Sequence, residues 1–283
     1  MLVPPRVLDL FAVPGGAVAV PGTGTVRAGD LALRPGRDAA LVGAVSPVQA
    51  RLAVRLDEAP GRGHRDLRLG LPVPARDGSW VVDGWSAARH EPGTEVCGDV
   101  AVVLGAGRLL HALLDVAVRT PPSALVERED PRGLAEAVAF GERPLTDALV
   151  ERLAKTTCVG VPAVRLAQEA LAALALLSAG PDPRPQQLVH AALAGNVHLE
   201  ALGAPFVTAI EPTWRPAPFA EATAVLDLVL DLGAPAPHLD ELASREETRA
   251  DLLRALVVRL LTGAGADDAH RTVLGLLAGR LVG

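Results

Sequence analysis

The sequence has almost no lysine and few aromatic residues. Among its 283 residues Lys155 is the single lysine, Arg supplies every other basic side chain, and there are three Trp, four Phe and no Tyr. Acidic residues outnumber basic ones by 33 to 27, so the net charge is −6. Binding to nucleic acid depends on a basic surface and often on aromatic rings that stack on bases. The composition therefore gives no support for a nucleic-acid partner.

Cysteine and long hydrophobic runs are also scarce. Cys97 and Cys158 are too few and too far apart for a disulfide framework or a zinc knuckle, and both are expected to be buried thiols. The most apolar helix candidate, residues 163–177, contains charged residues and is shorter than the about 20 residues that cross a bilayer. No basic stretch followed by a long apolar run opens the sequence. These features predict a cytoplasmic protein with no membrane partner.

Short strands are expected in the first part of the sequence. Pro-Gly and Ala-Gly turns separate strand candidates at 17–20, 25–27 and 31–34, and two more candidates lie at 67–71 and 79–83. One helix is expected among them. It would begin at Ser46, whose hydroxyl can cap free amides ahead of Pro47, and end near residue 58.

Helices are expected in most of the remaining sequence. Apolar residues at intervals of three and four predict helices at 96–119, 131–140, 144–155, 162–179, 217–230, 247–262 and 268–282. A hairpin-like island of strands interrupts them, at 187–189, 197–199 and 206–210. The order predicts an α+β protein with a β-rich lobe at 1–85 and a helical lobe at 86–283 that carries a small embedded hairpin.

One stretch carries most of the functional information. Residues 187–197 read QLVHAALAGNV, and residues 207–216 read VTAIEPTWRP. They resemble the catalytic loop and metal-binding strand of aminoglycoside phosphotransferases and choline-kinase-like enzymes, whose loop reads LVHGDLHxxN and whose strand ends in an Asp. In such enzymes one Asp accepts the proton of the attacking hydroxyl, the Asn ligates magnesium, and a second Asp bridges the metal and the nucleotide phosphates.

The resemblance extends over most of the chain. SWVVDGW at 79–85, DPRGLAEAVAFGERP at 130–144 and PTWRPAPFAEA at 212–222 are similar, in the same order, to an actinobacterial subgroup of this superfamily with no established function. The excess of Arg over Lys, with abundant Ala, Leu, Val, Gly and Pro, is typical of a high-GC genome such as an actinobacterium has. The resemblance implies a two-lobed protein-kinase-like fold, with a small β-rich N-lobe, a larger helical C-lobe and a ligand cleft between them.

The sequence departs from the family pattern where the chemistry is carried. His190 and Asn196 match the loop motif, but Ala192 stands where the catalytic Asp is expected. Ala209 falls where the metal-binding Asp is expected. The resemblance implies that His190 braces the backbone of the loop by hydrogen bonding. Because Ala192 stands where the catalytic Asp is expected, the resemblance implies that the loop is a degenerate catalytic loop.

Two further positions depart from the pattern. Arg34 is the best candidate for the lysine that contacts the nucleotide, and Gln49 lies near the expected partner carboxylate. The planar guanidinium of Arg does not mimic the compact ammonium of Lys. Losing both Asp residues removes the base and the main metal ligand, since Ala offers magnesium no oxygen. Conventional phosphotransfer is expected to be absent, and ATP and magnesium are expected as cofactors only if activity is retained.

Other candidates have two interpretations each. Glu211 lies two residues after the missing Asp, on the same face of an expected strand, and could hold a metal with Asn196 if activity is retained. In the simpler interpretation, Glu211 forms a salt bridge near Arg215. Gly22 and Gly24 could cover nucleotide phosphates in a glycine-rich hairpin, although a simple turn explains them equally well.

A group of acidic residues near the C-terminus also has two interpretations. A solvated surface explains it most simply. Aminoglycoside kinases, however, use acidic residues toward the C-terminus to bind cationic substrates, so a substrate site is the other interpretation. The residues are Asp240, Glu241, Glu246 and Glu247.

Two classes of function fit these observations, and the sequence does not decide between them. The first is a pseudokinase that binds a small molecule or a protein partner in the cleft between its lobes without phosphotransfer. The second is an enzyme that reuses the cleft for cyclisation, elimination or isomerisation of a natural-product intermediate. The second predicts a closed pocket in which His190, Glu211, Arg215 or Asp83 converge. A further alternative is an atypical small-molecule phosphotransferase that uses Asn196 and Glu211.

Overall fold

The chain folds as two compact units. The computed structural model describes residues 2–13, 16–20, 24–61, 63, 66–177, 182–263 and 265–279. Unit 1 comprises residues 1–97 and 195–212, and unit 2 comprises residues 98–194 and 213–283. The boundary predicted from the sequence was residue 85, so unit 1 also takes in residues 86–97 and a segment from the predicted hairpin region.

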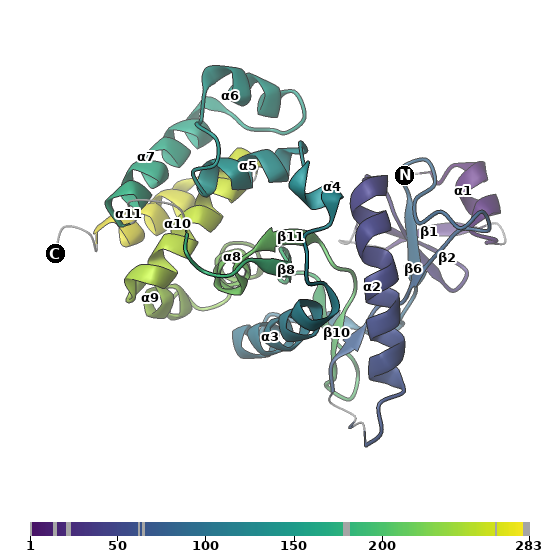
Figure 1. The fold of residues 1–283 in the computed structure, drawn as a ribbon. Coiled ribbons are helices and arrows are strands. Elements are labelled where there is room, and N and C mark those ends of the chain that lie inside the picture. Colours follow the sequence, from purple (N-terminus) through teal and green to yellow (C-terminus); the bar gives the residue numbers. More distant parts are fainter. Residues whose placement is uncertain are drawn as a thin grey trace. The chain divides into compact units, whose positions relative to one another are not determined.

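An antiparallel sheet of five strands forms the first part of unit 1 (Figure 1). Its strands are β1 (Ala17–Val20), β2 (Thr25–Ala28), β3 (Leu31–Arg34), β5 (Pro72–Val73) and β6 (Ser86–Arg89), in the order β1-β2-β3-β6-β5. Alternate residues of β2 and β3, such as Val26 and Leu33, are buried. They join a core with Trp85 and with Val7 and Phe11, contributed by a short helix, α1 (Pro5–Leu10), and its C-terminal cap, which the sequence did not predict.

The long helix of unit 1 begins earlier than predicted. Helix α2 spans Ala39–Asp57, and Asp38 caps it by accepting a hydrogen bond of 2.8 Å from the amide of Leu41. The prediction that Ser46 starts the helix is therefore wrong. Pro47 lies inside α2, where its missing N–H removes one backbone hydrogen bond from the helix.

A small second sheet of unit 1 joins segments that are far apart in the sequence. It has the order β4-β10-β9-β7, with β4 at Arg68–Leu69, β10 at Pro205–Val207, β9 at Val197–Leu199 and β7 at Glu95–Val96. Strand β10 is parallel to β4 and antiparallel to β9. A Cβ atom on Gly70 would lie 2.2 Å from the carbonyl oxygen of Thr208, so only glycine permits this approach. The pairing holds residues 208–211 against the first hundred residues.

The predicted strand at 79–83 is a tight turn. Val82 and Trp85 form an isolated antiparallel bridge, with Asp83 at φ 47° and Gly84 at φ 78° between them. Two consecutive positive φ angles are the requirement of a type I′ turn, for which Asp-Gly is a preferred pair. The Asp-Gly dipeptide was the sequence signal for this turn.

Helices make up most of unit 2 (Figure 1). They are α3 (Val100–Ala117), α4 (Ser123–Val126), α5 (Pro131–Ala139), α6 (Asp147–Ala154), α7 (Val161–Leu177), α8 (Ala217–Leu232), α9 (Pro237–Ala243), α10 (Glu246–Leu261) and α11 (Asp268–Gly279). Helix α10 is buried on nearly all sides after its first turn and packs against α5, α7 and α8. The seven helices predicted from apolar periodicity are confirmed, whereas α4 and α9 were not predicted.

A short pair of strands also forms between segments that are distant in the sequence. Strands β8 (Gln187–His190) and β11 (Pro212–Arg215) form a two-stranded sheet.

Cys97 in unit 1 is buried as expected, but Cys158 in unit 2 is exposed, which corrects the prediction for that thiol. By length and composition alone, α2 and α3 could cross a membrane, a test that core helices of soluble proteins also pass.

Candidate functional site

Arg34 links the three segments that the sequence marked as a nucleotide and metal site in unit 1. Its guanidinium donates one hydrogen bond to Asn196 Oδ1, at 3.3 Å, and another to Thr208 Oγ1, at 2.8 Å. The Thr208 hydroxyl in turn donates to Asn196 Oδ1 at 3.0 Å. Burial lowers the pKa of Arg34, the nearby Arg37 lowers it further, and Glu211 opposes both effects. A part-buried cation therefore engages Asn196, the residue of the motif that is expected to ligate magnesium.

Glu211 is bound to a second arginine. Arg37 donates to Glu211 Oε1 at 2.5 Å, and only 18% and 31% of the two side chains are exposed. Residues 208–211 follow the end of β10 and are not in a strand, so the expectation that Glu211 and Ala209 share a strand face is wrong. Within unit 2, Arg215, which the sequence suggested as a neighbour of Glu211, binds Glu136 and Glu142.

Gln49 has a role that a carboxylate could not fill. Its side chain is 5% exposed; Nε2 donates to the carbonyl of Gly70 at 2.7 Å, and Oε1 accepts from the amide of Ile210 at 3.1 Å. One side chain thus satisfies one donor and one acceptor of the backbone just beyond the paired strands β4 and β10. A glutamate could accept from Ile210 but could not donate to Gly70.

These residues do not fit a magnesium ion. Magnesium requires oxygen ligands, usually carboxylates, and Ala192 and Ala209 provide none. The remaining oxygen of the motif, Asn196 Oδ1, accepts hydrogen bonds from a guanidinium and a hydroxyl. Within the described part of the chain, no group of three or more His, Cys, Asp or Glu side chains could hold a metal.

The two glycines proposed to cover phosphates give no support for a nucleotide site. Gly22 lies outside the described residues. Gly24 adopts φ 62° immediately before β2, as a turn residue does. The simpler interpretation of Gly24, a turn between two strands, is therefore sufficient.

The degenerate loop in unit 2 is held by hydrogen bonds to its backbone. His190 is fully buried, its Nδ1 accepts from the amide of Ala192 at 3.3 Å, and its own amide donates to His111 Nε2 at 3.1 Å. Arg132 donates to the carbonyl of Ala191 at 2.8 Å. The geometry gives His190 and Arg132 a bracing role in this loop.

His111 was not recognised from the sequence. It lies on the buried face of α3 and is 2% exposed. Burial lowers its pKa from 6.5 to about 4, so the imidazole is neutral at physiological pH. The available signal was its spacing: His111 falls on the apolar stripe that Val103, Leu110 and Leu114 form along the helix.

Arg215 connects β11 with α5 and the turn that follows it. Its guanidinium makes two hydrogen bonds to Glu142, at 2.5 and 3.0 Å, and lies 3.6 Å from Glu136. The same guanidinium stacks over the ring of Phe140, 4.3 Å from its centroid. The protein itself thus supplies the anionic partners of Arg215, which gives this residue a structural role.

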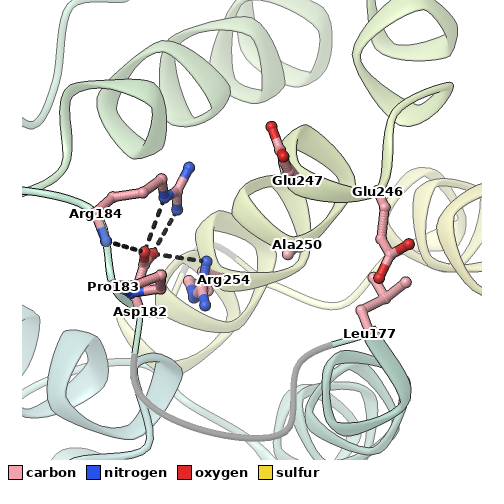
Figure 2. Close-up of a pocket in the computed structure, with 8 residues that line it drawn as sticks. All are labelled: Leu177, Asp182, Pro183, Arg184, Glu246, Glu247, Ala250 and Arg254. Atoms are coloured by element: carbon pink, nitrogen blue, oxygen red, sulfur yellow. Dashed lines mark hydrogen bonds and ion pairs between the residues drawn. The ribbon is translucent and has the colours of Figure 1, made fainter.

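A pocket of about 370 Å³ lies in unit 2 beside the start of α10 (Figure 2). On one side Arg184 and Arg254 bind Asp182 and the fully buried Asp251. The side chains around it include Leu177, Asp182, Arg184, Glu246, Glu247 and Arg254. Two of the acidic residues singled out in the sequence, Glu246 and Glu247, therefore line a cavity.

The two glutamates at this pocket differ from its other charged groups. Glu246 and Glu247 form no ion pair with the described residues, whereas both arginines are paired. Both glutamates lie in the first turn of α10, where negative charge is favourable against the helix dipole. Asp182 and Asp251 balance the charges of Arg184 and Arg254. Glu246 and Glu247 therefore make the net charge around the pocket negative.

Comparison with known proteins gives structural likenesses only. No protein-family model matches the sequence, and no curated protein matches it. A choline/ethanolamine kinase family protein from Mesorhizobium loti is 18% identical, with 98% of this chain and 92% of that chain covered and a TM-score of 0.47. An aminoglycoside phosphotransferase from Alicyclobacillus acidocaldarius is 13% identical, with 99% and 92% covered and a TM-score of 0.46. A fructosamine-3-kinase-like protein from Thermobifida fusca is 20% identical, with 98% and 97% covered and a TM-score of 0.42. At these values the likenesses carry no inference about activity.

Proposed function

We propose that this chain is a kinase-like protein that binds a small molecule without transferring phosphate. The kinase-like assignment rests on the motif resemblance and on the order of elements. An antiparallel sheet, with α2 between β3 and β5 in the sequence, precedes a helical unit. The observation that carries the loss of phosphotransfer is the contact of Arg34 with Asn196 and Thr208. A guanidinium takes the hydrogen-bonding capacity that a magnesium ion would need.

The charges around Arg34 oppose a metal as well. A divalent cation near Asn196 would lie beside two guanidinium groups, Arg34 and Arg37, with Glu211 already paired to Arg37. In a part-buried region like charges repel strongly, because little water screens them. Phosphoryl transfer depends on positioning and on stabilisation of negative charge by metal ions. An atypical phosphotransferase using Asn196 and Glu211 is therefore the weaker proposal.

The pocket beside α10 is the best candidate for a small-molecule site. Its volume of about 370 Å³ falls in the range of ligand pockets in proteins, about 300–1,000 Å³. The carboxylates of Glu246 and Glu247 line it without an ion pair to the described residues. A ligand with amino groups would complement them, and Leu177 and Ala250 supply apolar contact.

A repurposed enzyme is the second candidate, and no particular contact favours it. It required convergence of His190, Glu211, Arg215 and Asp83. None of the four lines the pocket beside α10. Each of the four has another partner within its own unit. His190 bonds to Ala192 and His111, and Glu211 pairs with Arg37. Arg215 pairs with Glu142, and Asp83 pairs with Arg6.

A transfer assay tests the loss of phosphotransfer. The purified chain is incubated with radiolabelled ATP and magnesium or manganese, and free phosphate and phosphorylated products are separated. An active small-molecule phosphotransferase is run in parallel as the positive control. The proposal predicts no release above a protein-free blank. ATP hydrolysis that rises in proportion to the protein, and disappears in an Asn196→Ala variant, would refute it.

A further inference from the structure

A second, smaller pocket lies entirely within unit 1. Its volume is about 40 Å³, and β3, β6, α2 and residues 208–212 surround it. A cavity needs about 10–15 Å³ by this measure to hold one water, so this pocket has room only for a ligand of a few non-hydrogen atoms. A nucleoside is too large for it. The polar residues that line it are Arg34, Arg37, Ser46, Gln49, Ser86 and Thr208.

The charge of this pocket is positive. Arg34 and Arg37 both line it, and none of its described lining residues is acidic. The nearest paired carboxylate is Glu211, which binds Arg37 and so balances one of the two guanidinium charges. Arg34 donates hydrogen bonds to an amide oxygen and a hydroxyl. Its positive charge therefore has no carboxylate partner among these contacts.

An unused donor also belongs to this pocket. The Nε–H of Arg37 is buried and has no hydrogen-bond partner among the described residues. Leaving a charged donor without an acceptor in a buried place is unfavourable, and it adds to the uncompensated positive character of Arg37. The pKa of Arg34 points the same way, because burial and the charge of Arg37 lower it and an anion would relieve both effects.

Ala209 connects this pocket to the degenerate motif. It lines the cavity at the place where the related enzymes carry an Asp. An Asp there would put a carboxylate beside the two guanidinium groups and neutralise the pocket. Replacement by Ala removes this charge and leaves space in its place.

We propose that the Arg34–Arg37 pocket binds a tetrahedral oxyanion, the size of phosphate or sulfate, without a metal ion. The oxyanion would accept hydrogen bonds from both guanidinium groups and from the hydroxyls that line the pocket. The anion could be free in solution or be the phosphate group of a small ester. This inference is independent of the proposed function, because its test uses neither ATP nor magnesium.

The test measures thermal denaturation of the full chain in the presence of EDTA. Inorganic phosphate, sulfate and chloride are compared at equal ionic strength, and glycerol phosphate is added as the small ester. A ligand that binds only the native state raises the denaturation midpoint as its concentration rises. We expect phosphate and sulfate to raise it and chloride to have little effect. Phosphate and glycerol phosphate should compete for the pocket. Tighter binding of glycerol phosphate would identify a phosphate ester as the ligand, and tighter binding of phosphate would identify the free anion.

Two variants of Ala209 give a matched pair. Ala209→Asp and Ala209→Asn introduce side chains of nearly the same size, but only Asp carries a charge. The Asp variant is expected to bind phosphate at least tenfold more weakly than the Asn variant. Equal responses of the two variants would overturn the proposal, as would a stabilisation by chloride equal to that by phosphate.

A second pair guards against misfolding of the Ala209 variants. Arg37→Gln removes a charge from the pocket, whereas Arg89→Gln, on β6, removes one from an exposed ion pair with Asp30. Binding of phosphate, measured by calorimetry, should be lost in the first variant and kept in the second. Loss in both, or in neither, would show that phosphate binds elsewhere or through general charge and would overturn the proposal.

Discussion

The guanidinium of Arg34 donates a hydrogen bond to the side-chain oxygen of Asn196, 162 residues later in the sequence. In the enzymes that the motif resembles, this asparagine ligates magnesium, and the position of Arg34 carries a lysine that contacts the nucleotide. Here the two candidate ligand-binding side chains bind each other. The contact makes Arg34 and Asn196 an internal structural connection of unit 1.

Replacing Arg34 by Lys should weaken this connection without creating activity. A lysine keeps the charge but has no planar fork to reach both Asn196 and Thr208. We expect the free energy of unfolding to fall by about 1–3 kcal/mol, the usual range for lost hydrogen bonds to charged groups. Urea denaturation measures this change. Arg89→Lys at an exposed site is the control and should change the value by less than about 0.5 kcal/mol.

ATP hydrolysis by the Arg34→Lys variant is a separate readout. The variant introduces the lysine of the motif that the sequence resembles but leaves Ala192 and Ala209 without carboxylates. No hydrolysis is therefore expected. Measurable hydrolysis would mean that arginine at this position, and not the missing carboxylates, keeps the protein inactive.

Gln49→Glu should be strongly destabilising, although it introduces the carboxylate of the pattern that the sequence resembles. The glutamate would be buried, would lose the hydrogen bond to the Gly70 carbonyl, and would place a negative charge against that oxygen. We expect a loss of about 2–4 kcal/mol at neutral pH, as for a buried polar group without its partner. The loss should shrink on acidification, because a protonated glutamate can donate again. A stability equal to that of the wild type at neutral pH would contradict the role assigned to Gln49.

Stability should fall on acidification because of His111. Its pKa is about 4 in the folded chain and about 6.5 when unfolded, so the unfolded chain binds more protons between these values. The free energy of unfolding therefore decreases as pH drops from about 6.5 to about 4, by about 3 kcal/mol in total. Above pH 6.5 both states are neutral at this residue and it contributes no pH dependence.

The His111→Gln variant isolates this contribution. Glutamine can still accept from the amide of His190 but does not titrate. Denaturation of both proteins in urea across this pH range should give a shallower slope for the variant. Parallel curves for wild type and His111→Gln would contradict the burial-induced pKa.

Spermidine, a small polyamine, should bind the pocket beside α10. Its ammonium groups complement the carboxylates of Glu246 and Glu247, which have no ion pair in the described residues. The double variant Glu246→Gln, Glu247→Gln should bind it at least tenfold more weakly in a calorimetric titration. Glu241→Gln on α9 removes one charge outside the pocket and should leave the affinity unchanged. Equal losses in both variants would indicate general charge attraction instead of a site.

The local elements could be predicted, because their signals are local. Gly24 precedes β2, Gly29 separates β2 from β3, and the helices of unit 2 show apolar periodicity. The start of α2 was missed because Ser46-Pro47 is a strong local signal for a helix start, whereas the actual cap, Asp38, lies two turns upstream. Val42 and Val45, which precede the proline, are buried in the fold. Tertiary packing of this face of α2 therefore outweighed the local signal.

The partners within the site could not be predicted from the sequence. The motif gave the correct residues to examine, Arg34, Asn196 and Glu211. The motif could not show that Arg34 binds Asn196 or that Arg37 binds Glu211, because these contacts join residues 162 and 174 positions apart. The end of β10 at Val207 decides where the side chains of 208–211 point, and that end depends on pairing with β4 and not on local propensity.

Calorimetric titration of the purified chain with ATP in the presence of magnesium tests the central claim most directly. The same titration is repeated with EDTA in place of magnesium. We predict no binding that depends on magnesium, because Asn196 is held by Arg34 and the two carboxylates are missing. Clear magnesium-dependent binding that disappears in the Asn196→Ala variant would contradict the account and show that this protein still holds a metal–nucleotide complex.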